Sequence, residues 1–386
     1  MERPIFQPVG TPVESLDTPA LVIDLDIMES NIDTLHDSFR QLLPDGETPQ
    51  TDACVRPHVS CHGCPEIALR QVSADEGLIE MAPSCTGGIA VASLGEAEVF
   101  ASAGFNDILI TGRAITGPKI RRLLALARDN WVFQAVDNLR NVQNLSEAAA
   151  AEDAILGILV DIDAGYGHGG VSSATDALAL ARAVEDAPGL ALMGLMAYEG
   201  PYSTTSQPEL QEESLRRLRV VNDAREQIEG AGIEITLVSA GSTYNYDVAA
   251  RIPGVTEVMA GVYPLMDGQM SRLRPELQPA ARVLSTVISH PVPGRAVVDA
   301  GHKTTGPDFG VAALDDIPGA VATRFSAEHG ILELEGEATG EFNPNDKVWL
   351  VPYNLSLCVN QFDYFRAVRD GRLVGYWPIS ARGRLD

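Results

Sequence analysis

Lysine is scarce in this chain of 386 residues: its 28 basic residues include only three lysines, Lys119, Lys303 and Lys347, and the rest are arginine. Such a bias is typical of GC-rich coding sequences and of salt adaptation, so by itself it identifies no function. It does restrict the chemistry, because a reaction that needs a side-chain amine has only these three candidates.

Positive charge and long apolar runs are also missing. The net charge of -25 argues against nucleic acid and anionic membrane surfaces as partners. No run approaches the ~18 apolar residues of a membrane-spanning helix, and the first residues, "MERPIFQPVG", lack the apolar segment of a signal peptide. Five cysteines are an odd and sparse set, which predicts no disulfide framework and a reduced, cytoplasmic location.

What the chain does contain is a repeated strand and helix pattern. "ALVIDL" predicts a strand, after which Asp26 is expected to cap a helix together with Glu29. Apolar residues at intervals of three or four predict the buried face of this helix: Met28, Ile32, Leu35, Phe39 and Leu42.

Eight further apolar stretches predict short strands that alternate with helices. Buried parallel strands have this short, apolar and β-branched character. Eight strand and helix units predict a (β/α)8 barrel rather than an open sheet. The expected strands are residues 54–56, 88–92, 107–111, 132–136, 155–162, 192–198, 234–239 and 256–260.

From about residue 273 the pattern changes. Stretches such as "ARVLSTVISHPV" and "DKVWLVPYN" read as alternating strands, separated by Gly, Pro and Asp turns. No helix of normal length is expected among them. This part of the chain therefore predicts an all-β C-terminal domain.

The ordered motifs resemble those of the D-threonine aldolase and D-serine dehydratase family, whose members are fold-type III enzymes that use pyridoxal phosphate (PLP). They include "DTPALVIDLD", "RPHVSCHGCPEIA", "VDIDAGYGHGGV", "GLMAYEG", "VSAGST", "TEVMAGVY" and "WPISARGR". The resemblance implies an alanine racemase-like barrel of residues 26–272 and a β domain of residues 1–25 and 273–386. It also implies a homodimer that acts on a small-molecule substrate.

Two residue types that the family's chemistry needs are replaced. The family has a lysine after the first barrel strand that holds PLP as an imine, so that the ring can accept electrons from bonds breaking at Cα. Ser60 stands at that position, so no covalent PLP is expected. Asn354 and Ser356 stand where the family has its metal ligands, and neither is a good ligand. No metal is expected, although a shifted alignment would recruit Cys358.

A third departure is His168, where the family has an arginine that faces the cofactor ring; histidine changes both charge and reach. The loops after the seventh and eighth strands match the family's motifs. Such loops bind phosphate through backbone N–H groups. They leave room for non-covalent PLP or another phosphate-bearing ligand. The expected cofactor-binding residues are Tyr198, Ser239, Gly241, Ser242, Thr243, Gly261 and Tyr263.

The expected catalytic residues are Ser60, Cys61, His58, His62 and His168. The histidines beside Ser60 are candidate proton carriers at a strand's carboxyl end, and hydrogen-bonded structural histidines are the alternative. The C-x-x-C spacing of Cys61 and Cys64 fits separate thiols near the pocket, a redox pair or part of a metal site.

These residues predict a divergent lyase, of the aldolase or dehydratase type, that acts on a small β-hydroxy amino acid or a similar polar metabolite without an imine at Ser60. One alternative is a ligand-binding or regulatory protein without catalysis. The other is a PLP enzyme whose imine has moved to Lys303, the one lysine in a family-like setting.

Overall fold

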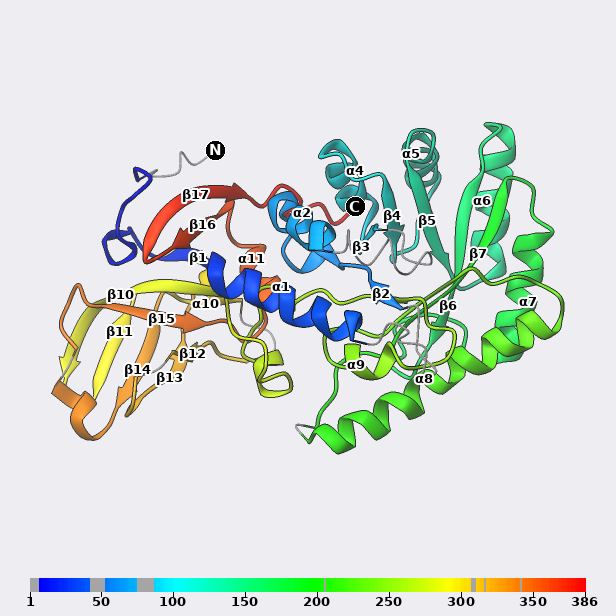
Figure 1. Cartoon of the computed structure of the whole chain (residues 1–386). Coiled ribbons are helices and arrows are strands. Elements are labelled where there is room, and N and C mark those ends of the chain that lie inside the picture. The colour runs from blue at the N-terminus through cyan, green and yellow to red at the C-terminus, as the bar shows by residue number, and fades with distance from the viewer. Residues whose placement is uncertain are drawn as a thin grey trace. The chain divides into compact units, whose positions relative to one another are not determined.

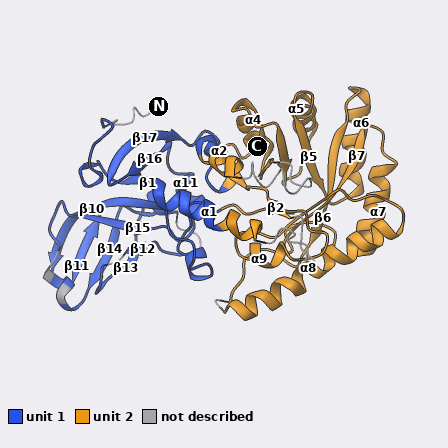
Figure 2. Cartoon of the chain, in the orientation of Figure 1, with its two compact units in different colours: residues 1–34, 61–66, 262–382 blue, residues 35–60, 67–261, 383–386 orange. Residues whose placement is uncertain are grey.

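The computed structural model describes residues 7–41, 53–74, 87–204, 206–306, 310–315, 317–340 and 342–386. The chain divides into two compact units (Figure 2). The barrel unit contains residues 35–60, 67–261 and 383–386. The β unit contains residues 1–34, 61–66 and 262–382.

Eight parallel strands form the sheet of the barrel unit, in the order β2-β9-β8-β7-β6-β5-β4-β3. A parallel bridge between His58 and Ala90 joins the two ends of this order and closes the sheet. The predicted barrel and its eight strands are confirmed. The strands are β2 (Cys54–Val55), β3 (Ile89–Val91), β4 (Asp107–Ile110), β5 (Trp131–Val136), β6 (Leu156–Asp163), β7 (Leu190–Tyr198), β8 (Leu237–Ala240) and β9 (Glu257–Val258).

Helices connect these strands, and α5 to α8 lie along the outside of the barrel sheet (Figure 1). Their buried faces are apolar, as in α5, where Ile120, Leu123 and Leu124 point inward. The helices in this stretch of the chain are α2 (Pro65–Ala74), α4 (Leu94–Ser102), α5 (Gly117–Ala127), α6 (Leu139–Ala151), α7 (Ala174–Glu185), α8 (Gln207–Gly230) and α9 (Tyr246–Ala249), with the short 3-10 turn η2 (Val59–Cys61).

Apolar side chains from the strands form one cluster in the barrel unit: Ala90, Leu109, Phe133, Ala135, Leu159, Met196, Leu237 and Met259. A buried arginine follows β2, and its guanidinium reaches the first residues of β4 and β9. Arg56, 1% exposed, donates through Nε and Nη2 to Glu257 at 2.7 and 2.6 Å and through Nη1 to Asp107 at 2.7 Å. Because Asp107 and Glu257 are the first residues of β4 and β9, this ion cluster closes the amino end of the barrel.

The β unit is built on a nine-stranded sheet whose main order is β13-β14-β11-β10-β1-β16-β17, with β15 paired to β10 and β12. Its pairs are antiparallel except β1 with β16. The helices among these strands have only four or five residues. The elements are β1 (Ala20–Asp24), β10 (Ala281–Val292), β11 (Arg295–Val298), α10 (His302–Thr305), β12 (Ala313–Leu314), β13 (Ala320–Phe325), β14 (Gly330–Leu334), β15 (Lys347–Val351), α11 (Leu355–Val359), β16 (Tyr364–Arg369) and β17 (Arg372–Pro378), with the 3-10 turns η1 (Val13–Ser15), η3 (Met270–Arg272) and η4 (Gly336–Gly340).

Helix α1 (Leu25–Arg40) begins one residue before its expected cap. Asp24, the last residue of β1, accepts hydrogen bonds from the backbone N–H groups of Asp26 and Ile27 at 3.1 and 3.2 Å. The prediction that Asp26 caps this helix is therefore wrong, because the strand leads into the helix directly. The predicted apolar face is buried at Met28, Ile32, Leu35 and Phe39, and Leu42 lies outside the described residues.

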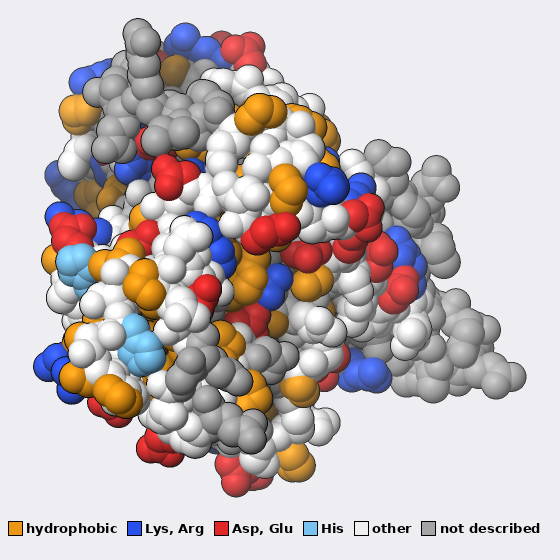
Figure 3. Space-filling model, turned by 90° about the vertical axis from the view of Figure 1, so that its left-hand side faces the viewer, with side chains coloured by type: hydrophobic (Ala, Val, Ile, Leu, Met, Phe, Trp, Pro, Cys, Tyr) orange, Lys and Arg blue, Asp and Glu red, His pale blue; other side chains and the backbone are white. Residues whose placement is uncertain are grey.

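Within the described ranges, no helix has the length and apolar character that crossing a membrane requires. On the face drawn in Figure 3, acidic and basic side chains are interspersed rather than gathered by sign.

Candidate active site

Ser60 lies after β2 at the carboxyl end of the barrel strands, where active sites of such barrels lie. Its hydroxyl donates to Glu96 Oε2 at 2.6 Å and accepts from the N–H of Ala92 at 2.7 Å. Glu96 and Ser93 form the capping box at the start of α4, and Glu96 Oε2 also accepts from the N–H groups of Ala92 and Ser93. Burial raises the pKa of Glu96. The Ser60 hydroxyl is therefore part of the hydrogen bonding that holds the first turn of α4.

His58 is half-buried beside this cap. Its Nε2 lies 3.5 Å from Thr111 Oγ1, which follows β4, and its N–H donates to the Ala260 carbonyl at 2.9 Å. Burial lowers the pKa of His58 to about 4, so the imidazole is neutral at physiological pH.

His62 and Cys61 belong to the β unit, whose boundary in the chain falls between Ser60 and Cys61. His62 is fully buried, and its Nδ1 accepts a hydrogen bond from the N–H of Cys64 at 3.1 Å. Cys61 is half-buried, and the four described cysteines form no disulfide bond. Catalysis by these two side chains stays a prediction.

An arginine and two aspartates meet at the carboxyl ends of β4, β5 and β6. Arg113 Nη2 lies 3.0 Å from Asp137 Oδ2 and also contacts Asp161 Oδ2. Asp161 is 1% exposed, and burial raises its pKa to about 7 against the opposing effect of Arg113. Burial also acts to raise the pKa of Asp137. A hydrogen bond from Asn138 and the charge of Arg113 outweigh it, so the pKa of Asp137 lies below its usual value.

The glycine-rich loop after β6 is folded around Asp163, whose Oδ1 accepts from the N–H groups of Gly165 and Gly167 at 2.9 and 3.0 Å. The loop places the rings of Tyr166 and His168 at 5.8 and 5.7 Å from the ring of Tyr198, which ends β7. Burial and the charge of Arg113 lower the pKa of His168. The structure thus brings His168 and Tyr198 together, as two of the expected site residues.

Glu199 follows Tyr198 and is fully buried. Its Oε1 accepts a hydrogen bond from Ser242 Oγ at 2.8 Å, and its Oε2 is buried without a hydrogen-bond partner among the described residues. Burial raises the pKa of Glu199 to about 7. This carboxyl group therefore links the end of β7 to the loop after β8.

The expected phosphate loops also meet. In the loop after β8, which starts at Gly241, the N–H of Ser242 donates to Asn245 Oδ1 at 3.0 Å. The N–H of Gly261 donates to Thr243 Oγ1 at 3.2 Å, which joins the loops after β8 and β9. Of the other expected residues, Ser239 is buried in β8, and Tyr263 is buried in the β unit.

Side chains at and near the family's metal-ligand positions form hydrogen bonds within the chain. Asn354 Oδ1 accepts from the N–H of Leu357 at 3.2 Å and so caps α11. Cys358 is buried, its thiol donates to the Thr304 carbonyl at 3.0 Å, and burial raises its pKa. Throughout the described ranges, no three His, Cys, Asp or Glu side chains are grouped so that they could hold a metal ion. Lys303 is 68% exposed and pairs with Glu328.

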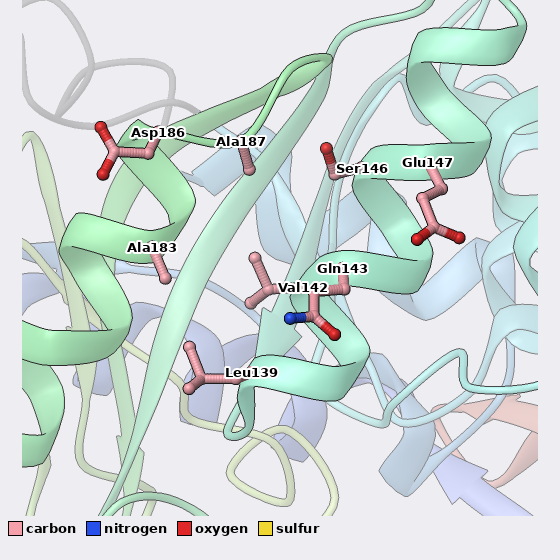
Figure 4. A pocket seen from close by; sticks show the side chains of 8 residues that line it. All are labelled: Leu139, Val142, Gln143, Ser146, Glu147, Ala183, Asp186 and Ala187. Carbon is pink, nitrogen blue, oxygen red and sulfur yellow. The ribbon is translucent and has the colours of Figure 1, made fainter.

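A groove of about 340 Å³ lies elsewhere, between α6 and α7 on the outside of the barrel (Figure 4). Leu139, Val142 and Ala183 line it together with polar side chains such as Gln143. It contains none of the residues at the strand ends, so it is not the candidate active site.

Sequence reasoning had not singled out Glu96, Arg113, Asp137, Asp161 or Glu199. Three signals were available. Glu96 follows Ser93 at the spacing of a capping box, and Arg113, Asp137 and Glu199 are charged residues just after apolar strands. Asp161 gave a third, as a carboxylate inside an otherwise apolar strand.

A closed parallel barrel with ionisable side chains at its carboxyl ends, in a chain that also builds a β-sheet unit, defines the fold-type III architecture. An alanine racemase N-terminal domain model matches residues 74–264, and a serine dehydratase domain model matches residues 280–368. The chain belongs to the D-threonine aldolase and D-serine dehydratase family.

The similarity extends over almost the whole chain. D-threonine aldolase of an Arthrobacter species is 33% identical over 98% of this chain and 96% of its own. The 3-hydroxy-D-aspartate aldolase of Paracoccus denitrificans is 29% identical over 97% of this chain and 94% of its own. The crystal structure of D-threonine aldolase from Filomicrobium marinum superposes with a TM-score of 0.89 at 30% identity, covering 98% of this chain and 100% of the other.

The family implies PLP, and the residues present fit it only in part. Phosphate binding by the loops after β8 and β9 stays a prediction, and the N–H groups of Ser242 and Gly261 in these loops donate within the chain. The covalent anchor does not fit, because a serine cannot form an imine and the Ser60 hydroxyl is bound to Glu96. A metal does not fit Asn354 and Cys358, because Asn354 Oδ1 caps α11 and the Cys358 thiol donates to the Thr304 carbonyl.

Proposed function

We propose that this chain is a lyase of the aldolase or dehydratase type that acts on a small β-hydroxy D-amino acid or a similar polar metabolite, without an imine at Ser60. Support comes from the full-length similarity to two aldolases and to the D-threo-3-hydroxyaspartate dehydratase of a Delftia species. One observation carries the proposal further: two buried carboxyl groups, Asp161 and Glu199, have pKa values raised to about 7.

Groups that titrate near the working pH are suited to proton transfer, because both protonation states are populated. Cleavage of the Cα–Cβ bond needs a base for the β-hydroxyl and an acceptor for the electron pair left at Cα, and loss of water needs an acid for the β-hydroxyl oxygen. PLP bound without covalent attachment to the chain would supply that acceptor. Asp161 is the proposed proton carrier, and its carboxyl group contacts Arg113 in the ligand-free chain. His58 and His168 are weaker bases, since the pKa of each is lowered. The loops of Gly241–Thr243 and Gly261 are proposed to bind a phosphate-bearing ligand without covalent attachment.

The test is an assay of aldehyde release from D-threonine and of ammonia release from D-threo-3-hydroxyaspartate, each with and without PLP and with a chelator. We expect turnover of at least one substrate, unchanged by EDTA, and a loss of about 100-fold or more in Asp161→Asn. Elemental analysis is the control: a stoichiometric metal that EDTA removes together with activity contradicts the proposed absence of a metal.

Ligand binding without catalysis is the second candidate. It is favoured by the hydrogen bonds of two side chains: Ser60 binds Glu96 and the N–H of Ala92, and Asn354 caps α11. It predicts no turnover under any of these conditions, together with a rise in Tm on addition of PLP or inorganic phosphate. The third candidate is a PLP enzyme whose imine has moved to Lys303. Borohydride reduction and peptide mapping test it, since only an imine on Lys303 leaves a pyridoxyl adduct at that residue.

A further inference from the structure

We propose that Arg113 binds the carboxylate of the substrate, and that Asp161 releases the guanidinium and takes up a proton as the substrate binds. The substrate class, a carboxylate-bearing metabolite, rests on the proposed function. The residues concerned are this chain's own: Arg113 is 15% exposed and lies after β4, between the ends of two neighbouring strands.

The guanidinium has one unused donor, Nε. Asp137 and Asp161 both contact Nη2, whereas Nε is buried without a hydrogen-bond partner among the described residues. Nε and Nη2 form the fork with which arginine binds both oxygens of one carboxylate. A buried N–H without an acceptor costs free energy, and a carboxylate seated on this fork supplies the acceptor.

The loop after β6 holds the guanidinium in place. A Cβ on Gly169 would lie 2.7 Å from Arg113 Nη2, so only glycine lets the backbone approach so closely. Gly170 of the same loop donates its N–H to Asp137 Oδ2 at 3.3 Å. Arg113 is thus fixed by the loop and by Asp137, and it keeps its position when Asp161 lets go.

The local charges explain why a proton accompanies the substrate. The charged groups that act on Asp161 are Arg113 after β4, Asp137 after β5 and Asp163 of its own strand. Arg113 and Asp163 also act on His168 of the next loop, with opposite signs. One positive charge faces three carboxylates, so a fourth is admitted only when one of them is neutralised. Burial raises the pKa of Asp161 to about 7, which makes it the carboxylate that takes the proton.

The sign of the pH dependence follows. Below pH 7 Asp161 is mostly neutral and the fork is open to a ligand. Above pH 7 Asp161 is ionised and competes for Arg113, so carboxylate affinity falls by up to tenfold for each pH unit, the limit for one linked proton.

Calorimetric titration of the full chain tests this with D-2-aminobutyrate, which lacks a β-hydroxyl and is not a substrate for either lyase reaction. Its alcohol, D-2-aminobutan-1-ol, is the matched ligand without a carboxylate. We expect the acid to bind at least tenfold more tightly than the alcohol, more tightly at pH 6 than at pH 8, and with uptake of nearly one proton at pH 8 in buffers of different ionisation enthalpy.

The variants separate the roles. Arg113→Gln should lose about 10- to 100-fold in affinity for the acid, as expected for a charged hydrogen bond, and Arg113→Lys, which keeps the charge without the fork, should lose less. Asp161→Asn should bind the acid with no dependence on pH between 6 and 8. Arg128→Gln, an exposed arginine paired with Glu152, is the control and should leave affinity unchanged.

Equal binding of acid and alcohol, no measurable binding of the acid, or affinity unchanged in both Arg113 variants overturns the inference. Lyase activity measured in parallel distinguishes it from the proposed function. Turnover of D-threonine with an unchanged KM in Arg113→Gln removes the inference and leaves the lyase. Binding that depends on Arg113 in a protein without turnover leaves the inference and removes the lyase.

Discussion

Ser60 lies where the family resemblance implies a lysine, and its hydroxyl is bound on both sides, by Glu96 and by the N–H of Ala92. A serine at this position has two consequences. It offers no amine for an imine, and its hydroxyl contributes a hydrogen bond at the start of α4.

Restoring the amine tests whether the rest of a PLP site is present. In Ser60→Lys the ammonium would lie beside the Glu96 carboxylate, which favours the protonated form and so slows imine formation. We expect imine absorbance with added PLP that develops slowly in Ser60→Lys and faster in the double variant with Glu96→Gln. Ser60→Met, of similar length without an amine, is the control. Absence of a borohydride-stable adduct at residue 60 in both lysine variants would mean that the pocket no longer accepts PLP.

Glu199 predicts how stability depends on pH. Its pKa is raised from 4.5 to about 7 in the folded chain, so its contribution to stability is fully present below about pH 4.5 and is lost as the pH rises through 7. Between about pH 5 and 7, above the unfolded pKa and below the folded one, this loss approaches about 1.4 kcal/mol per pH unit. Glu199→Gln should make the free energy of unfolding, measured in urea, fall less steeply over this range. Asp161 acts in the same sense, so part of the slope remains. The exposed Glu14→Gln is the control, and an equal slope in both variants contradicts the assignment.

At the scale of elements, the last residues of the chain, 383–386, hold helix α4. The C-terminus lies beside this helix (Figure 1). The N–H of Gly95 donates to the Asp386 carbonyl at 2.7 Å, and Arg122 of α5 pairs with the Asp386 side chain at 2.8 Å. The capping box that binds Ser60 thus lies in the same turn of α4 as this segment.

Gly95→Ala tests this packing. An added Cβ would lie 2.8 Å from Asp386 Oδ1 and 3.1 Å from the Arg384 and Asp386 carbonyls, so the segment must move. Glycine to alanine in a helix normally stabilises by about 0.5–1 kcal/mol, and here we expect a lower Tm instead. Gly230→Ala, in α8 with nothing within 4 Å of the new Cβ, is the matched control and should leave Tm unchanged or raised. A Tm that rises equally in both variants would show that the segment contributes nothing to α4.

At the scale of the whole molecule, barrel closure depends on an ion cluster rather than on apolar contacts alone. Arg56→Met leaves Glu257, 1% exposed, without its cation, and we expect a loss of about 3–5 kcal/mol in the free energy of unfolding. Arg128→Met, at a site 60% exposed, should cost less than about 1 kcal/mol. Denaturant unfolding of both variants measures the difference. Similar values for the two would show that the buried cluster is not a closure element.

The family resemblance predicts a homodimer, so light scattering at micromolar concentration should give about twice the 41.2 kDa of the chain. The physical reason is that the family's pocket is completed by a second subunit. A monomer at these concentrations, with lyase activity retained, would contradict the prediction.

Local patterns in the sequence determined the elements of this protein. Short apolar runs and helical periodicity predicted the eight barrel strands, because burial on both faces of a strand and on one face of a helix acts on residues close in the chain. The predicted departures from the family motifs at Ser60, His168 and Asn354 also rest on the sequence alone, since each is a residue type at a motif position. The cap of α1 was missed by two residues, because the polar group that caps it ends the preceding strand.

Only the tertiary structure decided what the charged side chains do. Arg113, Asp137 and Asp161 are 24 residues apart at each step along the chain and meet because parallel strands end at one rim of the barrel. Arg56 finds Glu257 only through barrel closure. The raised pKa of Asp161 and the occupied hydroxyl of Ser60 depend on burial and on neighbours distant in sequence, and no local pattern contains either.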